Sequence, residues 1–204
     1  MPSSDQSAAK SPRKILPAPE AQAQILEAVD DLFYREGARA VGVDAVVKRA
    51  GVNKMCLYRQ FESKDALLMH YLERREATFW GYIDASLAKH PGTPKAQLLQ
   101  LFTDVAERAG KPEYRGCAFV NVAVEFPDRD HPARQFVARC KGRLLDRLVS
   151  LGSDAGAADP GMLGRSLALL LEGAYAASQT YEREASVLSA LGPAARALIE
   201  GAVP

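Results

Sequence analysis

Apolar residues recur every three or four positions along most of the chain, which is the spacing of one face of an α-helix. The first such run predicts a helix over residues 20–36, because Pro19 suits a first turn and Gly37 ends the pattern. Its apolar face consists of Ile25, Ala28, Val29, Leu32 and Phe33. Tyr34 and Arg35 leave this stripe, so we expect them to face solvent, with a contact to a binding partner as the alternative.

Two short helices and the start of a long one are predicted over residues 43–64. The first carries an apolar stripe of Val43, Val46, Val47 and Ala50. Gly51 breaks this helix. The second has the larger side chains Met55, Leu57, Tyr58 and Phe61. We expect Asp44 to cap the first helix and Ser63 to cap the helix that begins at Lys64. Two short helices joined by a glycine-containing turn and supported by a third form a helix-turn-helix.

The rest of the pattern is also helical. A long helix should run from Lys64 to a stop at Pro91-Gly92, which is long enough to join the N-terminal helices to the remainder. Four or five helices should follow: one from Pro94, an apolar segment over 114–126, one from Pro132, a long one over 160–184, and one over 187–202 interrupted near Gly192-Pro193. The sequence therefore predicts an all-α fold.

Positive charge gathers at the helix-turn-helix. Residues 45–64 hold five basic side chains and one acidic one, a net charge of +4 in a chain whose total is +1. The basic residues are Lys48, Arg49, Lys54, Arg59 and Lys64. Such a concentration in a nearly neutral protein indicates a surface that faces phosphates.

Residues 46–67 resemble the DNA-binding signature of the tetracycline-repressor (TetR) family. The segments that carry the resemblance are Val46-Val47-Lys48-Arg49-Ala50-Gly51-Val52, Leu57-Tyr58-Arg59-Gln60-Phe61 and Ser63-Lys64-Asp65-Ala66-Leu67. The similarity covers about residues 20–75. It implies an N-terminal three-helix helix-turn-helix domain joined by a long helix to an α-helical domain that binds ligand and dimerises. The corresponding divisions are 1–18, 19–67 and 68–204.

The resemblance also implies DNA contacts. Leu57 and Phe61, four residues apart, should turn inward. The residues left towards the major groove are Asn53, Lys54, Cys56 and Arg59. In that groove Arg pairs with guanine and Asn with adenine. The phosphate contacts implied by the family are Tyr58, Gln60 and Lys64. Gln60 stands where the family usually has His, and Gly42 lies near a Thr that commonly contacts phosphate.

Candidate ligand-binding residues come from the remainder of the chain. Four-residue spacing puts Cys117, Asn121 and Glu125 on one helix face, and polar groups inside apolar walls orient a small molecule. The alternative is that Asn121 and Glu125 bond to neighbouring helices or cap a loop. Further candidates, for which a core position is the alternative, are Phe79, Trp80, Ile83, Phe102 and Tyr175. The apolar bias favours a small hydrophobic or aromatic effector.

A homodimeric regulator, most often a repressor, is the function that the resemblance implies. Its last two long helices would form the dimer, and a small molecule would release it from a palindromic operator. No cofactor or metal is expected, because the three cysteines lack metal-ligand spacing. One alternative is a redox-responsive regulator using Cys56 or Cys117, since oxidation adds bulk and polarity. A second is a cysteine-dependent enzyme using Cys117, His131 and Glu125, for which no local signature exists.

Cytoplasmic localisation is expected from three features. No apolar run reaches the roughly 18 residues of a membrane span, and the N-terminus lacks the core of a signal peptide. Cysteines without a CxxC pair fit a reducing compartment. The Ser-, Ala- and Pro-rich residues 1–18 predict a disordered leader. Its alternative is a basic arm that reaches the minor groove with Lys10, Arg13 and Lys14.

Overall fold

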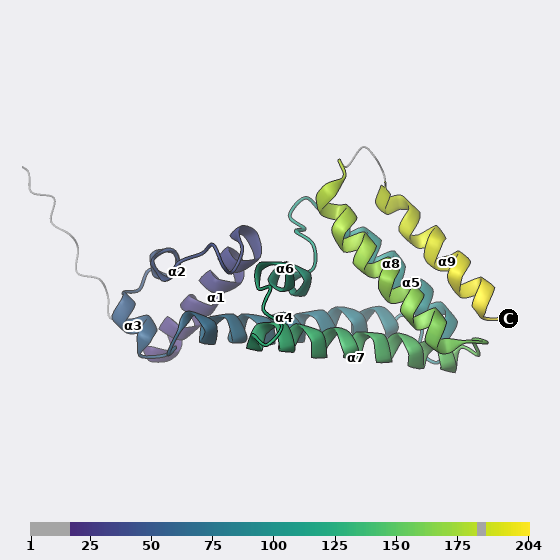
Figure 1. Ribbon diagram of the computed structural model, residues 1–204, viewed down its shortest axis with the longest axis horizontal. Coiled ribbons are helices and arrows are strands. Elements are labelled where there is room, and N and C mark those ends of the chain that lie inside the picture. The colour runs from purple at the N-terminus through teal and green to yellow at the C-terminus, as the bar shows by residue number, and fades with distance from the viewer. Residues whose placement is uncertain (1–16, 183–186) are drawn as a thin grey trace, which may run out of the picture.

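The computed structural model describes residues 17–182 and 187–204, and every regular element in those ranges is a helix. This confirms the predicted all-α fold. The expectations for residues 1–16, disorder or a basic arm, lie outside the described residues. Figure 1 shows an elongated molecule with three helices at one end, a long helix leading away from them, and the remaining helices gathered around and beyond it.

The first three helices form an end that we call the head. They are α1 (Ala18–Glu36), α2 (Val43–Ala50) and α3 (Lys54–Tyr58). Gly51 ends α2 with a φ of 68°, a left-handed conformation that favours glycine. Asn53 caps α3 by accepting a hydrogen bond from the Cys56 amide at 2.8 Å. Ser63 caps the next helix as predicted, because its Oγ accepts from the Ala66 amide at 3.1 Å.

The predicted capping role of Asp44 is wrong. The N-cap of α2 is Gly42, and no side chain accepts a hydrogen bond there. Asp44 lies in the first turn of α2, where its Oδ1 forms an ion pair with Lys54 Nζ at 2.8 Å. A contact between neighbouring helices has therefore replaced the local cap.

Helix α4 (Lys64–Leu87) links the head to the rest of the molecule, which we call the body (Figure 1). Its N-terminal half packs into the head through Leu67, Leu68 and Tyr71, and its C-terminal half packs into the body through Phe79 and Ile83. The buried apolar side chains of the described residues form one continuous cluster from α1 to α9. A displacement in the body can therefore reach the head along one rigid element.

The body consists of α5 (Pro94–Ala109), α6 (Ala118–Glu125), α7 (Pro132–Asp154), α8 (Pro160–Thr180), a 3₁₀ turn η2 (Val187–Ala190) and α9 (Leu191–Ala202). Helices α7 and α8 form the closest pair. A Cβ on Gly164 would lie 2.5 Å from Val149 Cγ2, so only glycine permits this approach. Helix α6 lies between head and body beside α4 (Figure 1).

Two predicted boundaries need correction. Helix α8 ends at Thr180 rather than near residue 184, because Tyr181 is extended with ψ 144°, and residue 184 itself is outside the described residues. The predicted interruption at Gly192-Pro193 occurs earlier, where η2 gives way to α9 at Leu191. Both Gly192 and Pro193 lie in the first turn of α9, where a missing proline N–H leaves no hydrogen bond unmade.

Candidate DNA-binding surface and ligand cavity

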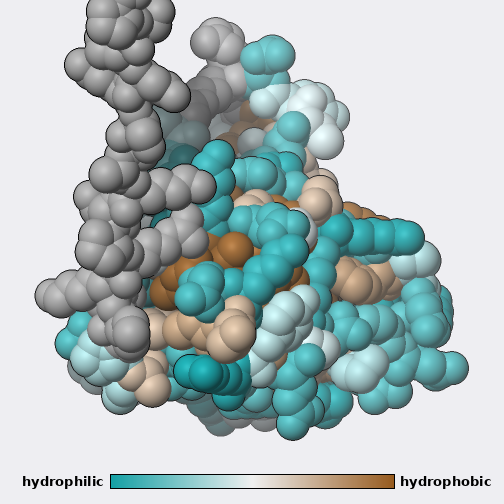
Figure 2. All heavy atoms as spheres, turned by 90° about the vertical axis from the view of Figure 1, so that its left-hand side faces the viewer, coloured by the Kyte–Doolittle hydropathy of each residue, from teal (hydrophilic) through white to brown (hydrophobic). Residues whose placement is uncertain are grey.

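The outer face of α3 is exposed. Leu57 and Phe61 are buried beneath it, as predicted, with 0% and 2% of their surface exposed. Among the candidate DNA contacts, the exposed ones are Asn53, Lys54, Tyr58 and Arg59, and the half-buried ones are Cys56, Gln60 and Lys64. Met55, a large side chain of the same helix that was not predicted to contact DNA, is 66% exposed. Figure 2 views this end of the molecule and shows mostly hydrophilic side chains around a small hydrophobic area.

The contacts of α3 leave some groups free and engage others. Asn53 uses its carbonyl oxygen for the cap, so its amide N–H groups remain available. The Asp44 carboxylate pairs with Lys54 and raises the pKa of that lysine. Arg59 contacts the Met55 sulfur at 3.6 Å and has no ion pair among the described residues. Arg59 is therefore the cation of α3 that is free to meet a base or a phosphate.

The side chains of Lys64 and Gln60, which the resemblance implies as phosphate contacts, are half-buried and contact other residues of the head. Lys64 Nζ donates to the backbone carbonyl of Arg39 at 2.8 Å, between α1 and α2. Burial lowers the pKa of Lys64, with the Glu125 carboxylate acting in the opposite direction. Gln60 Nε2 points to Cys56 Sγ at 3.7 Å. The Lys64 ammonium retains two further hydrogens for a phosphate.

Part of the positive charge that the sequence placed here is neutralised. Arg49 forms an ion pair with Asp31 of α1 at 3.0 Å, and Arg35 approaches the same carboxylate at 2.6 Å. The hydrogen bond from Arg49 lowers the pKa of Asp31. Lys48 is exposed and has no ion pair among the described residues. The free positive charge at the head is thus smaller than the count of basic residues suggests.

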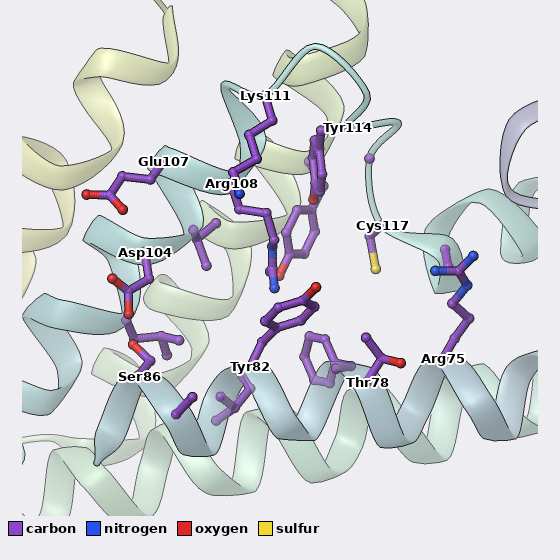
Figure 3. Close-up of a pocket in the computed structure, with 18 of the residues that line it drawn as sticks. Arg75, Thr78, Tyr82, Ser86, Asp104, Glu107, Arg108, Lys111, Tyr114 and Cys117 are labelled. Carbon is purple, nitrogen blue, oxygen red and sulfur yellow. The ribbon is translucent and has the colours of Figure 1, made fainter. Parts of the chain in front are cut away.

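A cavity of about 480 Å³ lies in the body near the head. Its walls come from α4, α5, the start of α6, α8, the segment joining α5 to α6, and Tyr34 of α1. Figure 3 shows side chains from α4 and α5 converging on it, with Tyr114 and Cys117 on the connecting segment above. Its apolar and aromatic lining includes Phe79, Tyr82, Ile83, Leu101, Val105, Phe119 and Tyr175. This volume lies within the usual range of small-molecule sites.

Four of the eight candidate ligand-binding residues line this cavity: Phe79, Ile83, Cys117 and Tyr175. Trp80 does not, because its ring turns away towards Glu76 and lies beneath the Arg143 guanidinium, 4.7 Å from the ring centre. Phe102 does not, because it is fully buried in the core. Aromatic periodicity alone does not separate a cavity face from a core face.

Asn121 and Glu125 also lie outside the cavity. Asn121 Nδ2 donates to the carbonyl of Arg115 at 2.9 Å. Glu125 Oε2 accepts from the backbone amide of Arg39 at 2.6 Å, and the Arg39 guanidinium donates to the Glu125 carbonyl. Of the three residues predicted to share a ligand-binding face, Cys117 lines the cavity. Asn121 and Glu125 instead form hydrogen bonds with neighbouring loops, which was the alternative for these two residues.

Tyr34, which the sequence reasoning placed in solvent, is a cavity residue. Its hydroxyl donates to the Gly116 carbonyl at 3.0 Å and accepts from the Arg115 amide at 2.8 Å. Arg75 lies over its ring, 4.8 Å from the centre, and donates to the Asp30 carbonyl. The only sequence signal for this position was that Tyr34 departs from the apolar stripe of α1. The contact connects residues more than eighty positions apart.

Metal-binding clusters and membrane-spanning helices are two further features that the described residues lack. The described residues include no cluster of three or more His, Cys, Asp or Glu side chains arranged to hold a metal ion. Within the same ranges, no helix has the length and apolar character needed to cross a membrane.

An exposed helix-turn-helix on a helical body that contains a cavity is the architecture of a DNA-binding regulatory protein. Comparison with known proteins narrows this class. Residues 25–71 match the profile of the family described as bacterial regulatory proteins, tetR family. SCO4454, a TetR-family transcriptional regulator from Streptomyces coelicolor, is 28% identical with a TM-score of 0.86, and the match covers 91% of this chain and 97% of that one.

A TetR transcriptional regulator from Streptomyces avermitilis is 33% identical with a TM-score of 0.77, and the match covers 89% of this chain and 97% of that one. The chain therefore belongs to the TetR family of transcriptional regulators. These are DNA-binding proteins and not enzymes, so the cysteine-dependent enzyme is excluded. The nucleoid occlusion factor SlmA of Actinobacillus pleuropneumoniae is 36% identical over 85 residues, 41% of this chain and 42% of SlmA. The chain thus matches less than half the length of that curated relative.

Proposed function

We propose that this regulator is a homodimeric repressor in the cytoplasm that a small molecule releases from a palindromic operator. The observation that carries the proposal is the position of Tyr34. It belongs to the head, it forms part of the cavity wall, and its hydroxyl is bonded to the segment that closes the cavity. A ligand that displaces this segment must alter a contact of α1.

The head, within residues 19–67, would bind DNA through α3. The free guanidinium of Arg59 is suited to guanine in the major groove, and the free amide of Asn53 is suited to adenine. The exposed Met55 side chain adds an apolar group for a thymine methyl. Tyr58, Gln60 and Lys64 would contact phosphates and fix the register.

The body, within residues 68–204, would bind the effector and dimerise through α8 and α9. Helix α8 exposes apolar and small residues on one face at helical spacing: Met162, Leu169, Gly173 and Ala176. Helix α9 exposes a similar set: Ala197, Leu198 and Gly201. Leu169 has 74% of its surface exposed, which is unusual for a leucine within a long helix. Two such helices from each copy would bury these faces in a four-helix interface and set the spacing of two heads.

A second route between body and head supports the same proposal. Glu125 at the end of α6 holds the backbone and side chain of Arg39, and Lys64 holds the Arg39 carbonyl. A Cβ on Gly37 would lie 3.0 Å from Glu125 Oε1, so α6 also sits tightly against the end of α1. Movement of α6 would therefore displace Arg39 and the connection between α1 and α2, which positions α2 and α3.

Binding of the purified protein to the DNA that flanks its own coding region tests this function. A dimer that binds specifically, and loses affinity steeply as salt is raised, is the expected result. A ligand then found to release the DNA must itself bind more weakly, by the same factor, when operator is present. A coupling of about 3 kcal/mol corresponds to a roughly 150-fold effect in each direction. Ligand and operator that bind independently would exclude the switch.

A redox-responsive version of this regulator would use Cys56 or Cys117. Cys56 is half-buried on α3, where oxidation would change the DNA-binding face, and Cys117 is buried in the cavity wall. Peroxide treatment of each cysteine variant, followed by titration with operator DNA, distinguishes a response at Cys56 from one at Cys117. Cys56→Ser would abolish a response that arises at α3, and Cys117→Ser one that arises in the cavity. Unchanged operator affinity after peroxide would end the redox version.

A further inference from the structure

The polar groups of the cavity restrict the chemistry of what it can bind. Arg108 of α5 projects into the cavity, with its guanidinium 4.5 Å from the ring centre of Tyr82 (Figure 3). It is half-buried, and it forms no ion pair or hydrogen bond with any residue in the described ranges. A cation withdrawn from water without an anionic partner is costly, so this guanidinium favours an anion.

The nearest carboxylates of the lining do not satisfy Arg108. Asp104 is engaged by Lys89 and by Gln100, each at 2.7 Å. Glu107 follows Asp104 along α5, is exposed, and points away from the cavity in Figure 3. Glu113 is an exposed residue of the rim and has no ion pair with Arg108. The positive charge of Arg108 therefore remains free to meet an incoming group.

Tyrosine hydroxyls supply further donors beside Arg108. Tyr175 is 3% exposed and lines the cavity, and no acceptor among the described residues receives its hydroxyl hydrogen. Tyr114 likewise lines the cavity without a hydrogen-bond partner for its hydroxyl in those ranges. Burial raises the pKa of both tyrosines, so both hydroxyls stay protonated and able to donate. The positive charge of Arg108 acts on the pKa of both tyrosines in the opposite direction to burial, which places the guanidinium close to both hydroxyls.

The cavity also has apolar and aromatic walls. Phe79, Ile83, Leu101, Val105 and Phe119 line it, and the Tyr82 ring lies directly beneath the guanidinium. Aromatic rings in offset or edge contact with such walls gain stabilisation beyond their buried area. A ligand that matches both parts has a planar apolar body and an acceptor-only anionic end.

We propose that the cavity binds an aromatic carboxylate, with Arg108 as its counter-ion and Tyr114 and Tyr175 as hydrogen-bond donors to the carboxylate oxygens. This rests on the proposed function only in taking the cavity as the effector site. It names the class of effector: an aromatic acid in preference to a neutral aromatic compound of equal size. Arginine suits the role because its planar fork matches both oxygens of a carboxylate.

Calorimetric titration of the full-length protein, without DNA, tests the proposal directly. The probes are biphenyl-4-carboxylate and its neutral counterpart biphenyl-4-carboxamide. We expect the acid to bind at one site per chain and about 10- to 100-fold more tightly than the amide, the range of a charge-assisted hydrogen-bonded pair. Arg108→Met should remove that preference by weakening the acid alone.

The matched control is Arg115→Met. Arg115 carries the same charge as Arg108, is exposed, and lies on the segment that joins α5 to α6, yet its side chain does not line the cavity. It should retain the preference for the acid, which excludes a general effect of net charge. Arg108→Lys keeps the charge and changes the geometry, so an intermediate preference is expected. If Arg108→Met does not fold, the acid preference of Arg108→Lys tests the role of the guanidinium instead.

Equal affinity for acid and amide, absence of binding by the acid, or an acid preference that survives both Arg108 variants would overturn the proposal. Adding operator DNA then tests the proposed function separately. If the acid binds through Arg108 but leaves DNA affinity unchanged, the ligand class stands and the ligand-controlled release of DNA fails.

Discussion

Arg59 and Lys64 carry the same charge but occupy different surroundings. Among the described residues, the Arg59 guanidinium bonds only to the Met55 sulfur, whereas the Lys64 ammonium is bonded to the Arg39 carbonyl and partly withdrawn from water. In the proposed complex, the Arg59 guanidinium at the end of α3 would reach a base edge, and Lys64, which is tied to the α1–α2 connection, would contact the DNA backbone. The two residues should therefore differ in what they contribute to DNA binding.

Arg59→Ala should cost about 1–3 kcal/mol on the specific site and little on random DNA, since it removes a base contact. Lys64→Ala should weaken all sequences alike and reduce the salt dependence by about one counterion. Anisotropy titrations on operator and random DNA over a salt series measure both. The same loss on both DNAs for both variants would contradict the division into base and phosphate contacts.

Tyr34→Phe removes one hydroxyl that joins the head to the cavity segment. The Arg115 amide and Gly116 carbonyl both lose their partner, so the free energy of unfolding should fall by about 1–2 kcal/mol. Urea unfolding measures the change. Tyr181→Phe is the control, because Tyr181 is 58% exposed and has no hydrogen bond from its hydroxyl within the described ranges. If the two substitutions changed the free energy of unfolding equally, the hydrogen bonds of the Tyr34 hydroxyl would not stabilise the protein.

At the scale of elements, the close approach of α7 and α8 fixes the frame of the body. Gly164 admits the backbone and side chain of Val149, which would lie 3.0 Å and 2.5 Å from an added Cβ. Neither the Val149 backbone nor its β-branched side chain can retreat easily within a helix. The two helices must therefore separate if Gly164 gains a side chain.

Gly164→Ala should destabilise the protein by about 1–3 kcal/mol through overpacking. Gly142→Ala, in α7, has no atom within 4 Å of the added Cβ and is the matched control. It should be stabilising by about 0.5–1 kcal/mol, because alanine loses less backbone freedom in a helix. Thermal or urea unfolding distinguishes the two signs. A neutral or stabilising Gly164→Ala would show that the contact between α7 and α8 does not require glycine at this position.

At the scale of the whole molecule, the proposed regulation requires two heads at a fixed distance. Helices α8 and α9, which both expose apolar residues, lie in the part of the molecule away from the head (Figure 1). A dimer joined there would leave both heads at the outer ends, where the tilt of each α4 sets their separation. Small rotations in the body would then become larger displacements at α3.

Leu169→Glu should weaken dimerisation by about tenfold or more, because it buries an unpaired charge in the proposed interface. Operator affinity should fall with it. Val124→Glu on α6 is the control, since Val124 and Leu169 have the same exposed fraction, 74%. Sedimentation over a concentration series measures the monomer–dimer equilibrium. A Leu169→Glu protein that stays dimeric would place the interface elsewhere.

Several features of the head could be predicted because they depend on neighbours in the sequence. The stop at Gly51, the cap at Ser63 and the inward turn of Leu57 and Phe61 all follow from backbone conformation and helical spacing. The cap assigned to Asp44 failed, because Lys54 of the adjacent helix offered its carboxylate a charged partner. Local preference decides a side chain only when no tertiary partner competes for it.

The sequence by itself determined the helical class, the helix-turn-helix and the family, since periodicity and short motifs are properties of contiguous residues. The tertiary structure alone decided which residues form the cavity. Phe79 and Phe102 have the same helical signature, yet one lines the cavity and the other is buried in the core. Tyr34 and Arg108 line the same cavity although they lie far apart in the sequence. Their proximity depends on how α1, α4 and α5 pack, and no spacing along the sequence encodes the direction of that packing.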